Sequence, residues 1–267
     1  DWTNKLVFGP ATEAPDVADN ALYDGKVADA AVNRLQQLAT TAKPFFLAVG
    51  FIKPHSPYIA PKKYFDLYND VAMPSDIPFP TDAPSYAGHG SAELRRYTDQ
   101  PKRGSIPDQT QLRVRHAYYA CISYIDAQIG RVLAALDQTG LSENTIVVLF
   151  GDHGYHLGEQ GLWTKANNYE LSTRVPLIMT LPPSSSKRPD LPPQQRGTTC
   201  SKLVELVDIF PTLADICRLP IPVGVEGSSF SSLLSDPNQI WKSAVFSQHP
   251  RDTKSNRHKG HGSIMGY

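Results

Sequence analysis

A long amphipathic stripe followed by a short β-branched run constrains the fold of this chain more than any other feature. Apolar side chains recur at i, i+3, i+4 and i+7 over residues 109–138, which predicts an amphipathic helix that stops at Thr-Gly in residues 139–140. Residues 145–150, Thr-Ile-Val-Val-Leu-Phe, then end at Gly151, a pattern typical of a buried parallel strand. A helix that leads into a buried strand favours an α/β layered sheet.

The rest of the chain alternates in the same way. Periodicity and proline positions predict helices over 16–41, 61–68 and 204–217, with Pro211 as a kink or break, and strands over 45–51 and 174–181. Residues 69–108 are different, because prolines and glycines interrupt them and no clear periodicity runs through them. Loops of that length are usually functional or disordered.

Composition excludes some classes of partner. The 267 residues are enough for a sizeable core, and 26 Lys+Arg balance 26 Asp+Glu, so no overall field points to nucleic acid or an anionic membrane. No apolar run approaches the roughly 20 residues that span a bilayer. The three cysteines lack metal-type spacing; Cys121 is expected as a small buried hydrophobe, and a Cys200–Cys217 bridge stays open.

Asp152 and His153 follow the predicted strand 145–150 directly. Ligands of open α/β sheets bind at the carboxyl ends of strands, and an adjacent carboxylate and imidazole suit a divalent cation. Oxygen ligands favour Ca²⁺ or Mg²⁺, whereas nitrogen ligands favour Zn²⁺ or Mn²⁺. Lys165 lies further along the loop, where it could meet an anion beside the cation. The structural alternative is that Asp152 caps a turn and His153 bonds a local carbonyl.

Lys53 and His55 follow the other predicted strand, 45–51, so both loops are expected to open onto one rim of the sheet. A histidine can give a proton to a departing oxygen, and a lysine can neutralise developing negative charge. The alternative is a surface lysine beside a packed loop histidine.

The residues between Asp152 and Lys165 have more modest predicted roles. Gly154, Gly158 and Gly161 would let the backbone turn tightly and approach a ligand. Glu159 is expected as a structural hydrogen-bond acceptor and Trp163 as a packing anchor, while Tyr155 and His156 either line a pocket mouth or face solvent. Residues 249–261, which include His249 and Arg251, form a basic segment that either binds an anionic substrate or is a solvated loop.

Together these residues resemble the sulfatase family of the alkaline-phosphatase-like superfamily. The resemblance rests on residues 44–55, 118–131 and 151–165, and extends over 175–178, 203–213, 247–251 and 264–267. It implies an α/β/α sandwich around a mostly parallel sheet, incomplete in this chain. Residues 1–220 would be the C-terminal part of the catalytic domain, and 221–267 the start of a smaller C-terminal subdomain.

The resemblance also implies roles for single residues. Asp152 and His153 would belong to the shell of a Ca²⁺ ion, His55 would contact the sulfate or the leaving-group oxygen, and Lys165 would bind the sulfate. Substrate contacts are expected from Lys53, Tyr155, His249 and Arg251. The family hydrolyses sulfate esters with a formylglycine made from the Cys or Ser of a Cys/Ser-x-Pro-x-Arg motif: a hydroxyl of the hydrated aldehyde attacks sulfur.

Several parts of the family pattern are absent. No Cys or Ser of the chain stands in the nucleophile motif, and the paired Asp of the metal site and the Lys and His after the nucleophile are missing as well. We therefore expect an N-terminally truncated chain that is inactive alone and binds Ca²⁺ weakly.

The expected substrate is a sulfated sugar or another sulfate ester, and the expected location is periplasmic, secreted or lysosomal. The alternatives are a phosphonate or phosphate ester hydrolase of the same superfamily and a non-catalytic carbohydrate-binding relative. The oligomeric state is not predicted.

Overall fold

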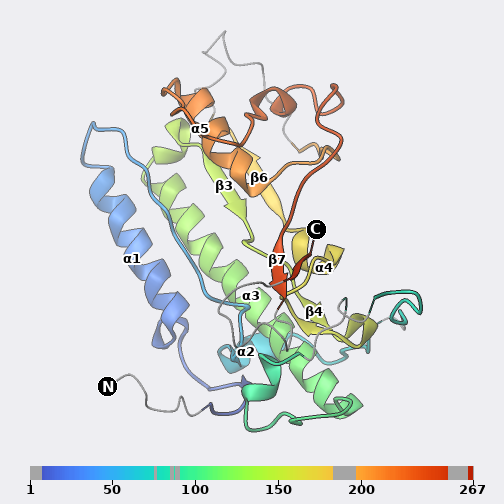
Figure 1. Ribbon diagram of the computed structural model, residues 1–267. Coiled ribbons are helices and arrows are strands. Elements are labelled where there is room, and N and C mark those ends of the chain that lie inside the picture. The colour runs from blue at the N-terminus through green and yellow to red at the C-terminus, as the bar shows by residue number, and fades with distance from the viewer. Residues whose placement is uncertain are drawn as a thin grey trace, which may run out of the picture. The chain divides into compact units, whose positions relative to one another are not determined.

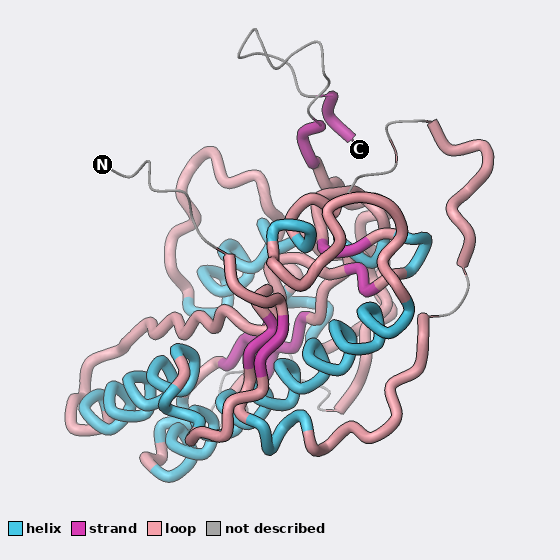
Figure 2. Tube along the Cα trace, turned by 90° about the horizontal axis from the view of Figure 1, so that it is seen from below, coloured by secondary structure: helices cyan, strands magenta, loops and turns pink. Residues whose placement is uncertain are grey.

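The computed structural model describes residues 8–74, 77–84, 87, 91–182, 197–251 and 264–266, in which helices alternate with short strands (Figures 1 and 2). These residues form two compact units. The first takes its residues from Asp1–Leu141 and Tyr155–Ala166, and the second from Ser142–Gly154 and Asn167–Tyr267. The predicted boundary between 220 and 221 lies inside the second unit and stays a prediction.

Two long helices that lie side by side dominate the first unit. They are α1, Tyr23–Leu38, and α3, Asp108–Gln138. The 31 residues of α3 make it about 46 Å long, and the predicted helix over 109–138 is confirmed. Its inward face buries Cys121 completely, as expected for a small hydrophobe, and Gly140 with a φ of 71° follows its end.

Short elements complete the first unit. They are β1 (Thr12–Glu13) paired parallel with β2 (Tyr58–Ile59), β4 (His156–Leu157) paired antiparallel with β5 (Trp163–Thr164), α2 (Lys62–Phe65), and the 3₁₀ turns η1 (Asp19–Ala21), η2 (Leu94–Arg96) and η4 (Glu159–Gly161). The predicted helices over 16–41 and 61–68 are therefore shorter than expected. The described part of 69–108 contains the single turn η2 and is otherwise irregular, as predicted.

The predicted strand over 45–51 is wrong. These residues have no ladder partner among the described residues, and Phe46 is 85% exposed. The sequence pattern registers apolar content, whereas a strand also requires a neighbour that accepts and donates backbone hydrogen bonds.

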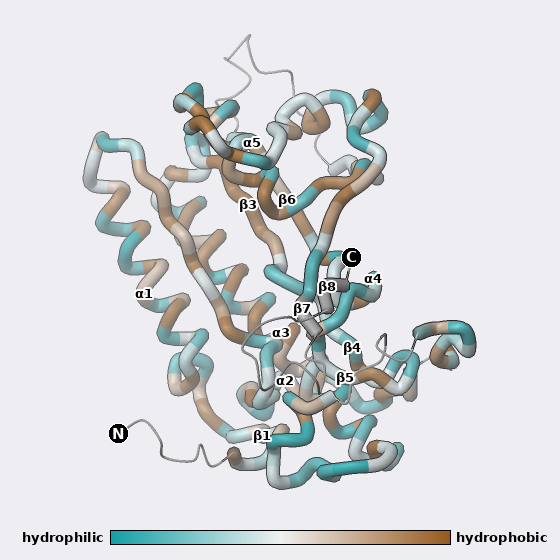
Figure 3. The backbone as a smooth tube through the Cα atoms, viewed as in Figure 1, coloured by the Kyte–Doolittle hydropathy of each residue, from teal (hydrophilic) through white to brown (hydrophobic). Residues whose placement is uncertain are grey.

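The second unit is built around an antiparallel pair, β3 (Val147–Phe150) and β6 (Leu177–Thr180), both apolar (Figure 3). The turn η3, Leu141–Asn144, precedes β3 along the chain. The other elements of the unit are α4 (Glu170–Thr173), η6 (Leu206–Asp208), α5 (Ile209–Cys217), η7 (Ser231–Leu234), and β7 (His249–Arg251) paired antiparallel with β8 (Ile264–Gly266). Its core gathers Ile209, Phe230 and Leu233 against residues of β3 and β6.

Two predictions for the second unit need correction. The strand over 145–150 was expected to be buried and parallel, but its described partner β6 is antiparallel and Phe150 is 48% exposed. An antiparallel partner needs no crossover helix, and the described residues leave this end of the strand uncovered. Pro211 causes no break, because α5 begins at Ile209 and the proline falls in its first turn.

The remaining sequence expectations concern cysteines and membranes. Cys200 and Cys217 are both free and exposed, so the bridge that the sequence left open is absent. Among the helices that the structure describes, none is long and apolar enough to cross a bilayer.

Candidate active site

A buried carboxylate at the start of α1 positions the loop that carries Lys53 and His55. Asp24 is 2% exposed, and its two carboxylate oxygens accept hydrogen bonds from the backbone N–H groups of Ile52 and Lys53, each at 2.9 Å. A charged acceptor that satisfies two neighbouring backbone donors stabilises one conformation of this loop. The loop is therefore held by α1 rather than by a strand.

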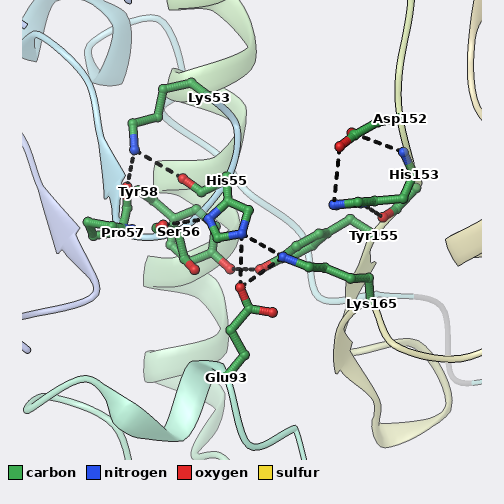
Figure 4. A network of polar contacts seen from close by, with 11 residues as sticks. Lys53, His55, Ser56, Pro57, Tyr58, Glu93, Asp152, His153, Tyr155 and Lys165 are labelled. Atoms are coloured by element: carbon green, nitrogen blue, oxygen red, sulfur yellow. Dashed lines mark hydrogen bonds and ion pairs between the residues drawn. The ribbon is translucent and has the colours of Figure 1, made fainter. Parts of the chain in front are cut away.

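The side chain of Lys53 points back into its own loop. Its Nζ donates to the carbonyl oxygens of His55, at 3.0 Å, and of Pro57 (Figure 4). Burial lowers the pKa of Lys53, against the opposing influence of Cys121 and Asp24. The alternative of a surface lysine is wrong. The hydrogen bonds of the Lys53 amine stabilise its own loop, and the predicted role of Lys53 in substrate binding stays a prediction.

His55 turns one ring nitrogen to its own loop and the other to charged partners. Its Nδ1 lies 2.7 Å from the carbonyl oxygen of Ser56, which can only accept, so Nδ1 carries a proton. Its Nε2 lies 2.6 Å from Nζ of Lys165 and 3.1 Å from Oε1 of Glu93. The hydrogen bond to Glu93 raises the pKa of His55, while burial and Lys165 oppose the shift. The structure thus brings together two residues that lie 110 positions apart.

Lys165 sits on a strained stretch of backbone. Thr164 and Ala166, on either side of it, have φ values of 71° and 79°. Left-handed backbone at residues other than glycine costs on the order of 1–3 kcal/mol each and is common at functional sites. The Nζ of Lys165 also donates to Oε1 of Glu93 at 2.9 Å. The surrounding contacts therefore hold the ammonium group in place despite a strained backbone.

Glu93 completes this cluster, and the sequence did not predict it. Hydrogen bonds from His55 and Lys165 lower its pKa to about 2, although burial opposes the shift. Glu93 immediately precedes η2, within the irregular 69–108 segment. The only sequence signal for it was the unusual length of that segment, which is typical of functional loops.

Tyrosine rings lie beside the cluster. Tyr155 stacks on Tyr118 with ring centroids 5.4 Å apart, and its hydroxyl lies 2.6 Å from that of Tyr58. Nζ of Lys165 is 6.0 Å from the centroid of the Tyr155 ring, within cation–π range. Burial raises the pKa of both Tyr58 and Tyr155, so both hydroxyls are neutral. Tyr155 is thus half-buried against Lys165, and its role in substrate binding stays a prediction.

The loop between Tyr155 and Lys165 is held by its own glutamate. Oε2 of Glu159 accepts from the backbone N–H of Leu157 at 2.7 Å, and Arg115 of α3 donates to Oε1 of Glu159 and to the carbonyl of Leu157. Trp163 is 3% exposed and packs in the core of its unit. The predicted structural acceptor and packing anchor are both confirmed.

Asp152 and His153 belong to the second unit and make mainly local contacts. Oδ1 of Asp152 accepts from the backbone N–H of His153 at 3.0 Å, and Nδ1 of His153 donates to the carbonyl of Gly154 at 2.8 Å (Figure 4). These are the contacts of the structural alternative. The predicted approach of the Gly154 backbone to a ligand stays a prediction. Here the backbone packs on the protein itself, because a Cβ on Gly154 would lie 2.1 Å from the carbonyl oxygen of Leu171.

The same pair fits half of a metal site. The Asp152 side chain is 86% exposed, and its Oδ2 lies 3.9 Å from Nε2 of His153, so a carboxylate oxygen and a ring nitrogen are both available to a cation. Across the described ranges, no group of three or more His, Cys, Asp or Glu side chains is arranged for a metal ion. The carboxylate oxygen of Asp152 suits Ca²⁺ in type, whereas the ring nitrogen of His153 is a donor that transition metals prefer, and two ligands are far fewer than the six to eight that Ca²⁺ takes.

The predicted residues near the C-terminus lie apart in sequence from these two sites. His249 begins β7 and Arg251 ends it, and Asn168 donates to the carbonyl of Ser247 nearby. The rest of the basic segment, 252–261, lies outside the described residues. The substrate-binding roles of His249 and Arg251 stay predictions.

Comparison with known proteins gives one consistent result. The family model described as Sulfatase matches residues 4–218. The chain is 35% identical to mouse (Mus musculus) iduronate 2-sulfatase over 79% of the chain and 42% of that protein, and 36% identical to an arylsulfatase of Clostridium perfringens over 81% and 43%. A phosphonate monoester hydrolase from Silicibacter pomeroyi superimposes with a TM-score of 0.75 at 22% identity, covering 97% of this chain and 54% of the other. The chain therefore spans about two fifths of the length of these curated relatives.

Proposed function

The chain belongs to the sulfatase family, and from this membership we propose that it forms part of a sulfuric ester hydrolase whose anion-binding wall is made by His55 and Lys165. The observation that carries the proposal is the 2.6 Å contact between Nε2 of His55 and Nζ of Lys165. Two nitrogen groups that converge on one point from separate loops suit the oxygens of a sulfate ester.

In this proposal each residue has one task. Lys165 binds a sulfuryl oxygen and neutralises charge that develops there, and His55 donates the proton on Nε2 to the leaving-group oxygen as the S–O bond breaks. Lys53 and Asp24 hold the loop of His55 in the required position. Tyr155 flanks the ester, and His249 and Arg251 contact a sulfated sugar, the substrate class suggested by the name of iduronate 2-sulfatase.

Two groups would come from outside these residues. The nucleophile is a formylglycine on a segment that the 267 residues do not contain, since no Cys or Ser here stands in the Cys/Ser-x-Pro-x-Arg motif. Asp152 and His153 would hold Ca²⁺ with further ligands from that segment. The formylglycine would supply the attacking hydroxyl, and the cation would stabilise charge on the sulfuryl oxygens.

The test compares the chain with the protein that also carries its upstream segment, identified by sequencing before the codon for Asp1. We expect the isolated chain to release no 4-nitrophenol from 4-nitrophenyl sulfate, and the longer protein to release it. In the longer protein, His55→Gln and Lys165→Met should each lower kcat/KM by about 100-fold. Lys62→Met is the control, because Lys62 is exposed and pairs with Asp66.

Turnover by the isolated chain would contradict the proposal. The alternative function is phosphonate or phosphate ester hydrolysis. The observation that favours it is the likeness in fold to a phosphonate monoester hydrolase. It would be supported by a longer protein that cleaves 4-nitrophenyl phenylphosphonate faster than the sulfate. An upstream segment without any nucleophile would instead support a non-catalytic carbohydrate-binding relative.

A further inference from the structure

Glu93 makes a contact that the proposed hydrolysis does not by itself require. Its Oε1 lies 3.1 Å from Nε2 of His55 and 2.9 Å from Nζ of Lys165, so one carboxylate oxygen joins both members of the anion-binding wall. We propose that Glu93 is a positioning residue that keeps the Nε2 proton on His55 and fixes the orientation of the ring. This proposal rests on the proposed function for its catalytic meaning, but its physical claim concerns His55 alone.

The two ring nitrogens of His55 have different partners. Because Nδ1 donates to the carbonyl of Ser56, only Nε2 can exchange a proton with the site. In the neutral ring, Nε2 is an acceptor and takes a hydrogen bond from Lys165. In the protonated ring, Nε2–H is a donor, and Oε1 of Glu93 is the acceptor that faces it. Glu93 and Lys165 therefore favour opposite protonation states of the same ring.

The charged groups that face the His55 ring determine its protonation state. The nearest groups are the carboxylate of Glu93 and the ammonium of Lys165, while Nζ of Lys53 contacts the backbone carbonyl of His55 rather than its ring. The neighbouring hydroxyls of Tyr58 and Tyr155 are neutral and hydrogen-bonded to each other. Without Glu93, the ring would face the positive charge of Lys165 with no negative charge beside it, and this repulsion would lower the pKa of His55.

Glu93 is itself held in place, as a positioning residue must be. Its side chain is 28% exposed. Two residues earlier, the hydroxyl of Ser91 accepts from the backbone N–H of Trp163 at 3.1 Å, which ties this segment to the strand that leads to Lys165. Two residues later, Arg95 donates to the carbonyls of Pro101 and Gly104. The segment that carries Glu93 is thus tied down on both sides, on one side to the strand that leads to Lys165.

The direct test is an NMR titration of the His55 ring in the 267-residue chain, which needs neither the nucleophile nor a substrate. We expect the wild-type ring to titrate above its ordinary pKa of 6.5 and Glu93→Gln to lower that midpoint by about one unit or more. Glu93→Asp keeps the charge on a shorter side chain and should recover part of the shift. Asp82→Asn removes an exposed carboxylate of the same 69–108 segment and should change nothing.

A second variant keeps the test decisive if Glu93→Gln does not fold. Lys165→Met removes the opposing charge, so the midpoint of His55 should rise above the wild-type value. The proposal is overturned if Glu93→Gln folds and leaves the midpoint unchanged or raises it, or if Lys165→Met lowers it. Failure of the longer protein to hydrolyse sulfate esters would contradict the proposed function and leave this result untouched, so the two failures are distinguishable.

Discussion

The loop that runs from Asp152 to Lys165 ends in two sites of opposite construction. At Lys165, the ammonium group meets side chains from loops 72 and 110 positions away, and its partners His55 and Glu93 contact each other as well. At Asp152 and His153, the hydrogen bonds described above join each residue to the next one along the chain, and the carboxylate is 86% exposed. The first site is held together by long-range side-chain contacts, whereas the second consists of local contacts and an exposed carboxylate.

The difference follows from how each site is stabilised. The cluster around Lys165 depends on long-range contacts, so it exists only when its unit is folded, and these contacts shift the pKa values of His55 and Glu93. The pair Asp152–His153 depends on turn geometry that a short peptide segment can reach by itself. Substitutions should therefore disturb the first site through folding and the second through ligand binding.

The largest expected effect is at the support of the first site. Asp24→Ala removes the acceptor for two backbone N–H groups, which should lower the free energy of unfolding by about 3 kcal/mol. Urea unfolding followed by circular dichroism measures it. Asp66→Ala is the control, since its ion pair with Lys62 is exposed and should cost less than about 0.5 kcal/mol. Equal losses in the two variants would mean that Asp24 is not the support of this loop.

A smaller loss of stability is expected at Gly154, the glycine that follows Asp152 and His153. Gly154→Ala places a Cβ 2.1 Å from the carbonyl oxygen of Leu171, and the backbone shift should cost about 2 kcal/mol. The matched control is Gly151→Ala, because a Cβ there meets its nearest neighbours at an ordinary 3.6 Å. Thermal unfolding of both variants measures the difference. If Gly154→Ala is as stable as Gly151→Ala, the backbone around Gly154 can shift without cost and the prediction is wrong.

A third comparison uses pH to test the first site. Because the pKa of Glu93 is lowered from 4.5 to about 2 in the folded chain, its contribution to stability is present above pH 4.5 and is lost as the pH falls towards 2. The wild-type chain should therefore exceed Glu93→Gln in unfolding free energy by about 1 kcal/mol at pH 6, and the difference should shrink on acidification. A difference that stayed constant from pH 6 to pH 3 would contradict the charged network.

The smallest effect on stability is expected at the second site. Asp152→Ala should change the unfolding free energy by less than about 0.5 kcal/mol, because the carboxylate is exposed. The same variant should abolish the weak binding of Ca²⁺ that we propose for this site, as measured by calorimetric titration, while His55→Gln leaves it intact. Loss of Ca²⁺ binding in His55→Gln alone would reverse the assignment of the two sites.

Patterns carried by neighbouring residues predicted much of this molecule. The stripe over 109–138 predicted α3 to within one residue, and the motif residues His55 and Lys165 proved to lie 2.6 Å apart. Features that depend on distant partners escaped prediction. The run 45–51 has the composition of a strand but no described neighbour to pair with, and Glu93 has its role only because Ser91 and η2 position it in an irregular segment. The periodicity of a sequence shows neither whether a strand has a neighbour to pair with nor which distant side chains meet in the fold.

The burial of Trp163 has a practical consequence for following this site. Its indole is 3% exposed, its backbone N–H is bonded to Ser91 in the segment that carries Glu93, and its chain neighbours lead directly to Lys165. The chain has three tryptophans, the others being Trp2 and Trp241. Replacing those two by phenylalanine would leave Trp163, between the two segments of the cluster, as the single tryptophan, which can be excited selectively at wavelengths where the tyrosines do not absorb. Its emission would then report optically, without a label, on changes in the surroundings of these two segments.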